Sequence, residues 1–95
     1  MIAQIVNAKM VNGKLDKANC IIITPDNGGW RITVYDQDGE ILKTTWGMTG
    51  YFATEKAFTL HDFYRNHMVI MTHEYNADGV LYESNKILRS GYLPE

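Results

Sequence analysis

Turn signals of one chemistry divide this chain into short segments. They are Asn12-Gly13, DNGG at 26–29, DQDG at 36–39 and NADG at 76–79. Asn, Asp and Gly tolerate the positive φ that tight hairpin turns require. The segments around the first three signals are rich in strand-forming residues and cover 2–10, 20–24, 30–35 and 40–46. This spacing predicts an antiparallel meander of about four strands.

Two of the turn signals belong to a repeated phrase, VYDQDGEIL at 34–42 and EYNADGVLY at 74–82. Its paired acidic residues raise the question of a calcium loop. An EF-hand loop spreads its ligands over about twelve residues, with Gly at position 6. Here Gly39 directly follows Asp38, and the second copy keeps only Asn76 and Asp78. We therefore interpret both copies as hairpin turns and expect no metal site there.

Helical periodicity appears only between the two copies. The segment ATEKAFTLHDFYRN (53–66) carries apolar side chains at spacings of 4, 3 and 4, which place them on one helical face. They are Ala53, Ala57, Leu60 and Tyr64. Thr54 is the expected N-cap. The sequence predicts one helix with a single apolar face.

Strand periodicity returns at 68–75 and 80–84, and the tail from 85 is expected to be a short helix or irregular. The run 21–23 is apolar throughout and predicts a strand covered on both faces. The run 30–35 alternates and predicts one buried and one solvated face. The resulting order, ββββ-α-ββ, predicts a single compact α+β domain over 1–95, with the helix packed on one face of an antiparallel sheet.

Composition narrows the classes of function. The single cysteine, Cys20, permits no internal disulfide, and no apolar run approaches the ~20 residues of a membrane span. We therefore expect an intracellular, cytoplasmic protein in a reducing environment. The net charge of −2 lacks the basic excess typical of nucleic-acid binders, so nucleic acid is not an expected partner.

Two features support a phosphate-binding or nucleic-acid-binding alternative. Lys9, Lys14 and Lys17 form a small basic stretch. Gly47 and Gly50 form a GxxG pattern before the predicted helix, whose N-terminus could receive an anion. We favour the interpretation that these glycines allow a sharp bend and close packing.

The residues with catalytic or ligating chemistry do not form a recognised pattern. His61, His67 and His73 are six residues apart, a spacing that does not align imidazoles on one helical face. We expect His67 at the helix end, and neither metal nor cofactor. Cys20 precedes an aliphatic run, which predicts a small buried residue rather than a nucleophile. An enzyme is not expected, and one centred on Cys20 is the third hypothesis.

Phe58 is the best interaction candidate, because it falls outside the apolar face of the predicted helix, between Asp62 and Arg65. Aromatic residues beside Arg often anchor protein interfaces. Ile70, expected on a less buried strand face like Ile41, and Tyr92 in the tail could join it. The alternative is that Phe58 packs beneath the N-terminal hairpin or the tail.

These observations predict a non-catalytic protein–protein interaction module that binds a larger intracellular partner or itself. Small accessory or inhibitory proteins of phages and mobile elements have this general character.

Overall fold

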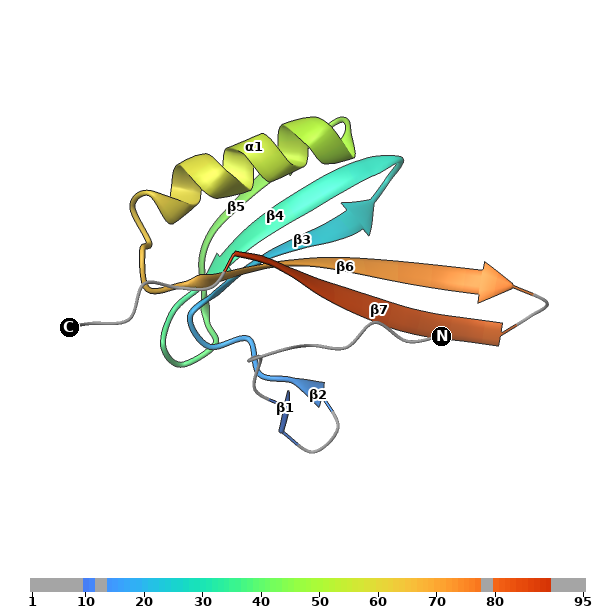
Figure 1. Cartoon of the computed structure of the whole chain (residues 1–95), viewed down its shortest axis with the longest axis horizontal. Coiled ribbons are helices and arrows are strands. Elements are labelled where there is room, and N and C mark those ends of the chain that lie inside the picture. The colour runs from blue at the N-terminus through green and yellow to red at the C-terminus, as the bar shows by residue number, and fades with distance from the viewer. Residues whose placement is uncertain (1–9, 12–13, 78–79, 90–95) are drawn as a thin grey trace.

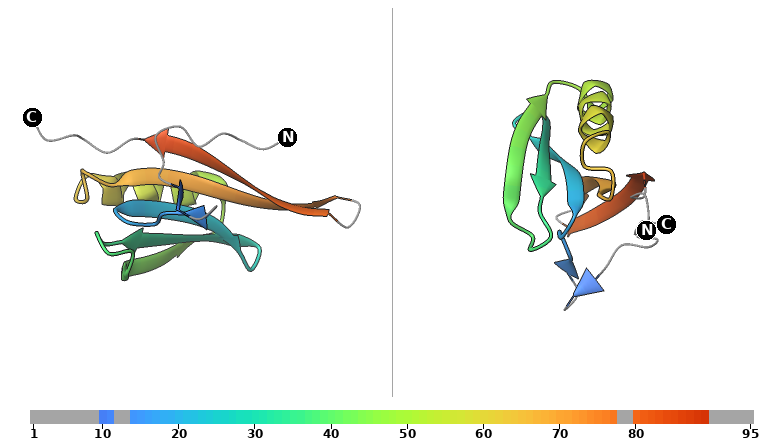
Figure 2. Two further views of the ribbon diagram at one scale, coloured as in Figure 1. Left: turned by 90° about the horizontal axis from the view of Figure 1, so that it is seen from below. Right: turned by 90° about the vertical axis from the view of Figure 1, so that its left-hand side faces the viewer.

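The computed structural model describes residues 10–11, 14–77 and 80–89. In these ranges the chain forms an α+β fold with one helix, α1 (Gly50–His61), on a five-stranded sheet. The sheet strands are β3 (Cys20–Asp26), β4 (Gly29–Tyr35), β5 (Ile41–Gly47), β6 (Met68–Ala77) and β7 (Val80–Arg89). Figures 1 and 2 show α1 lying along one face of the twisted sheet.

The sheet is mixed, so the prediction of a wholly antiparallel sheet is wrong. Its strand order is β5-β4-β3-β6-β7, and β3 and β6 run parallel, with Ile22 opposite Ile70. All other neighbours are antiparallel. A parallel pair needs a crossover connection, and α1 supplies it by carrying the chain from the β5 edge back to β3. β5 is therefore an edge strand (Figure 1).

The predicted meander has three strands in this sheet, β3 to β5. The first predicted strand, 2–10, lies outside the described residues except for Met10. Met10 belongs to β1 (Met10–Val11), which pairs with β2 (Lys14–Leu15) as a separate two-stranded ribbon. The chain therefore reverses direction between β1 and β2, and the predicted turn residues Asn12 and Gly13 lie outside the described residues.

The turn chemistry of the sheet is as predicted. Asn27 and Gly28 adopt positive φ values of 49° and 77° between β3 and β4. In the first copy of the repeated phrase, Asp36 Oδ1 accepts hydrogen bonds from the backbone N–H groups of Asp38 (2.8 Å) and Glu40 (2.9 Å). The second copy joins β6 to β7 in an antiparallel hairpin. That hairpin continues to Arg89, so the expected helix or irregular structure from 85 is wrong through this residue.

The helix begins earlier and ends earlier than predicted. Thr49, rather than Thr54, is the N-cap, and its side chain accepts a hydrogen bond from Phe52 N. The predicted apolar face is confirmed, since Ala53 and Ala57 are fully buried. Leu60, and Tyr64 just beyond the helix, pack against the same core.

Apolar residues cover both faces of the central strand β3, as predicted for 21–23. On the helix side the buried cluster comprises Ile21, Ile23, Ile32, Val34, Ala53, Ala57 and Val69. On the opposite side Cys20, Ile22 and Ile70 are buried, with Tyr35, Met68 and Ile87 packed against them. This second cluster reaches β4, where Thr33 is buried, so the prediction of a wholly solvated second face on this strand is wrong.

Candidate functional site

The structure favours a packing role for Phe58. Its ring is half-buried against the helix-side core. The Arg89 guanidinium carbon lies 3.7 Å from the ring centroid, a cation–π arrangement. Arg89, the last described residue of β7, therefore covers the Phe58 ring. It lies next to the tail, beneath which the alternative interpretation placed Phe58.

The other predicted interface residues do not form one surface. Asp62 is exposed and is the C-cap of α1, and Arg65 is exposed in the turn that follows. Ile70 is fully buried in the sheet, so its predicted place on a less buried face is wrong. The reason is that β6 is an interior strand, covered on that face by the second cluster. Tyr92 lies outside the described residues.

Two histidines pack beneath the end of α1. His61, in the last helical turn, has its Nε2 2.9 Å from the His67 carbonyl oxygen. His67 lies six residues beyond the helix end, contrary to prediction, and its Nε2 is 2.7 Å from the Tyr35 carbonyl oxygen. Desolvation by burial lowers the pKa of His67, opposed by the hydrogen bond to Tyr35, and the charge of His61 lowers it further. The arrangement favours a neutral, structural imidazole.

Cys20 and the described histidine and acidic side chains were the candidates for catalytic or ligating chemistry. Cys20 is buried, as predicted, and its Sγ lies 3.5 Å from the Ala18 carbonyl oxygen. Within the described ranges, no three His, Cys, Asp or Glu side chains are grouped to hold a metal ion. The side chain of His73 is not among those described.

The 47–50 loop packs closely, as predicted. A Cβ atom on Gly47 would lie 2.9 Å from Ala53 N, so the glycine is required for the close approach of loop and helix. Thr49 occupies the N–H groups of Phe52 and Ala53 through its side chain and carbonyl oxygen. Phosphate binding at the remaining amides stays an untested prediction.

Only part of the basic stretch named for the phosphate-binding or nucleic-acid-binding alternative lies within the described residues. Lys17 Nζ lies 5.4 Å from the centroid of the Tyr35 ring. Lys14 belongs to β2, and Lys9 lies outside the described residues.

The turn between β5 and α1 exposes apolar side chains that the sequence analysis did not select. Met48, Tyr51 and Phe52 are 69%, 71% and 59% exposed, and Trp46 just before them is 41% exposed. The rings of Tyr51 and Phe52 meet edge to face, with centroids 5.9 Å apart. We call these four residues the apolar turn. The sequence did contain a signal for this surface, because Tyr51 and Phe52 are two consecutive aromatic residues directly before Ala53, the first apolar residue of the predicted helix.

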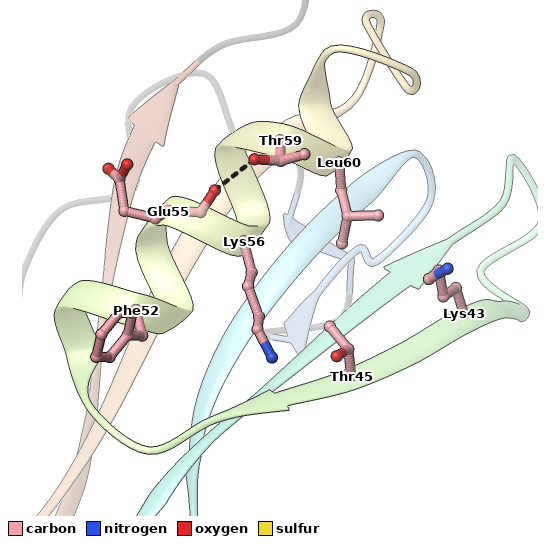
Figure 3. A pocket seen from close by; sticks show the side chains of 7 residues that line it. All are labelled: Lys43, Thr45, Phe52, Glu55, Lys56, Thr59 and Leu60. Carbon is pink, nitrogen blue, oxygen red and sulfur yellow. Dashed lines mark hydrogen bonds between the residues drawn. The ribbon is translucent and has the colours of Figure 1, made fainter.

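A groove runs between α1 and β5, next to the apolar turn. It holds about 330 Å³ of open space and is lined by Lys43, Thr45, Phe52, Glu55, Lys56, Thr59 and Leu60. Lys56 reaches from the helix to the strand, where its Nζ donates a hydrogen bond to the Trp46 carbonyl oxygen at 2.6 Å. Figure 3 shows Lys56 directed toward β5, whereas the Glu55 side chain points away from the strand.

The pairing register shows which backbone groups of β5 face its neighbour. Asp26 pairs with Gly29 across a two-residue turn, and such hairpins close on a hydrogen-bonded pair. The polar groups of Gly29 therefore face β3. The direction of the backbone N–H and C=O groups alternates along β4, so those groups of Ile32 face the other way, toward its partner Thr45 on β5. Thr45 thus directs its own polar groups inward.

The neighbours of Thr45 must then direct their backbone groups outward. Thr44 and Trp46 present N–H and C=O groups at the edge of the sheet. The hydrogen bond from Lys56 to the Trp46 carbonyl oxygen agrees with this assignment. Along β5 only Gly47 is buried. The strand therefore offers an accessible edge beside the groove.

Comparison of the chain with protein-family models, with curated proteins and with solved structures finds no match. None of the helices in the described ranges is both long enough and apolar enough to span a membrane. The functional proposal therefore rests on the geometry of the surface.

Proposed function

We propose that this protein is a non-catalytic protein-interaction module that binds a larger partner through the apolar turn and the adjoining α1–β5 groove. The observation that carries the proposal is the exposure of Met48, Tyr51 and Phe52 close together in the chain around the start of α1, where the rings of Tyr51 and Phe52 are in contact. Such a surface would serve a small accessory or inhibitory protein that acts on a larger intracellular partner.

The physical argument is the free energy of hydration. Exposed apolar area costs free energy in water, roughly 25 cal/mol per Å², and contiguous patches usually mark binding surfaces. Aromatic residues are enriched at interface centres, where two side-chain torsions carry a large contact area. The rings of Tyr51 and Phe52 meet edge to face, which brings two aromatic side chains together in one patch.

Affinity capture from the native host with the purified protein as bait tests this proposal. We expect a specific partner to be retained by the unmodified protein, and by Phe63→Ala, which removes a 79% exposed aromatic beyond the other end of α1. Tyr51→Ala combined with Phe52→Ala should reduce the retained partner at least about tenfold, the loss expected when interface anchors are truncated. The melting temperature of this double variant should stay close to that of the unmodified protein, because both replaced side chains are exposed.

Equal capture by the double variant and the unmodified protein would contradict the proposal. Retention on heparin at moderate salt, without a captured protein, would favour the phosphate-binding alternative. A change in capture only with Phe58→Ala, at unchanged melting temperature, would place the interface at Phe58 rather than at the apolar turn.

A further inference from the structure

We propose that the α1–β5 groove takes an extended, acidic segment of the partner, which adds to the sheet as a sixth strand beside β5. This inference rests on the proposed function and specifies the class of partner. Strand addition supplies affinity through backbone hydrogen bonds and specificity through every second side chain.

The first support is the exposed edge itself. The seven-residue strand β5 is long enough to pair with a peptide. The outward N–H and C=O groups of Thr44 and the outward N–H of Trp46 would pair with its backbone, while the Trp46 carbonyl oxygen keeps its hydrogen bond from Lys56. Natural proteins commonly protect such edges with lysine, proline or a bulge, and here Lys43 lies on the edge strand, where an acidic peptide would neutralise its charge. The bulge in the β4–β5 ladder lies at Val34/Tyr35, near the far end, which leaves the Thr44–Trp46 part regular.

The second support is charge. An added strand would direct alternate side chains toward α1, into the part of the groove lined by Lys43 and Lys56. Figure 3 shows the Lys56 ammonium near β5, whereas the Glu55 carboxylate, which also lines the groove, is directed away from that strand. Carboxylates at those positions of the peptide would pair with the lysines, and an intervening apolar residue could contact Phe52.

The same lysines argue against a second copy of this chain as the occupant. If two β5 strands paired antiparallel around Thr44, both Lys43 side chains would be diagonal neighbours on one face. Pairing around Thr45 would instead place Lys43 opposite Gly47 of the second copy, close to where Lys56 reaches the strand. Like charges in neighbouring cross-strand positions are destabilising. An acidic segment removes this repulsion.

Selection from a phage-displayed library of random twelve-residue peptides against the intact protein tests the inference. We expect enriched peptides to carry Asp or Glu at alternate positions. Fluorescence anisotropy with the synthetic peptides should show affinity reduced about fivefold to tenfold by Lys43→Glu, the effect of replacing a surface ion pair with a repulsive one. Lys86→Glu makes the same charge change on β7, the other edge strand, and should leave affinity unchanged.

Thr44→Pro tests the backbone pairing. It removes an outward N–H group while leaving the inward hydrogen bonds of β5 to β4, so binding should fall at least about tenfold. If this variant fails to fold by circular dichroism, amide exchange in the unmodified protein replaces it. Peptide binding should then slow exchange at Thr44 and Trp46.

Several results would overturn the inference. They are enrichment of basic or uncharged peptides, failure to enrich any peptide, and equal binding by Lys43→Glu and Lys86→Glu. Concentration-dependent dimers that Thr44→Pro abolishes would identify a second copy as the occupant and likewise overturn it. Peptides that lose affinity with Tyr51→Ala and Phe52→Ala but not with Thr44→Pro would refute strand addition while leaving the interaction function intact.

Discussion

At the scale of single residues, two glycines of one loop have different roles. A Cβ on Gly47 would approach Ala53 N at 2.9 Å, Ala53 Cα at 3.0 Å and Ala53 Cβ at 3.2 Å. The nearest neighbours of a Cβ on Gly50 would be atoms of the Trp30 ring, at 3.5 Å or more, which is ordinary contact. The GxxG pattern therefore contains one glycine, Gly47, that close packing requires. The other, Gly50, can be replaced by alanine at the start of the helix.

This difference gives a matched pair of substitutions. Gly47→Ala should lower the free energy of unfolding by about 1–3 kcal/mol, because the helix must move away from β5. Gly50→Ala should be neutral or slightly stabilising, because alanine favours the helix. Urea denaturation of both variants measures the difference. Equal losses would show that the close approach at Gly47 is not the constraint.

At the scale of elements, the start of α1 depends on its cap. Thr49 Oγ1 accepts the Phe52 N–H at 3.1 Å, which satisfies one donor that the first helical turn leaves without an intrahelical partner. Thr54, the cap predicted from the sequence, lies one turn inside the helix. The cap also orients Tyr51 and Phe52, so it positions the apolar turn.

We expect Thr49→Ala to reduce the free energy of unfolding by about 1 kcal/mol, the usual cost of losing an N-cap. Thr54→Ala should change it by no more than about 0.5 kcal/mol, since alanine is the better helix former inside the helix. Thermal unfolding followed by far-ultraviolet circular dichroism compares them. A larger loss with Thr54→Ala would mean that the helix begins where the sequence predicted.

At the scale of the whole molecule, His67 links the end of the helix to two strands. Its ring reaches the Tyr35 carbonyl at the end of β4, its own carbonyl accepts the His61 hydrogen bond, and β6 begins at the next residue. The Nε2–H of His67 donates to the Tyr35 carbonyl oxygen, and its Nδ1 lies 3.1 Å from Asn66 Oδ1. This contact therefore joins the helix side of the fold to the sheet.

The lowered pKa of His67 gives the direction of a pH effect. The unfolded chain binds this proton at about pH 6.5, whereas the folded chain resists it, so stability is present above that pH and falls as the pH drops below it. We expect the free energy of unfolding to decrease from pH 7 to 5. His67→Gln, which retains an N–H donor, should flatten this dependence in urea titrations. An unchanged slope in the variant would assign the effect to other groups.

The sequence predicted the features that depend on near neighbours. The Asx-Gly turns, the apolar face through Ala53 and Ala57, and the double coverage of 21–23 follow from turn chemistry and periodicity. It did not predict that Ile70 would be buried, because strand alternation does not say which strand lies alongside. Phe58 falls outside the apolar stripe of the helix. The residue that covers it, Arg89, is 31 positions further along the chain, so the periodicity of the helix does not reveal this contact.

One helix between antiparallel hairpins can therefore be predicted from the residues alone, because each of these features is set within a few positions of the chain. The parallel insertion of β6 beside β3, which leaves β5 at the edge, becomes known only from the folded arrangement of the strands. The reason is that strand pairing is a long-range competition between complementary surfaces, and local propensity does not reveal which pair wins. The exposed edge and its neighbouring groove, on which the functional proposal depends, are products of that competition.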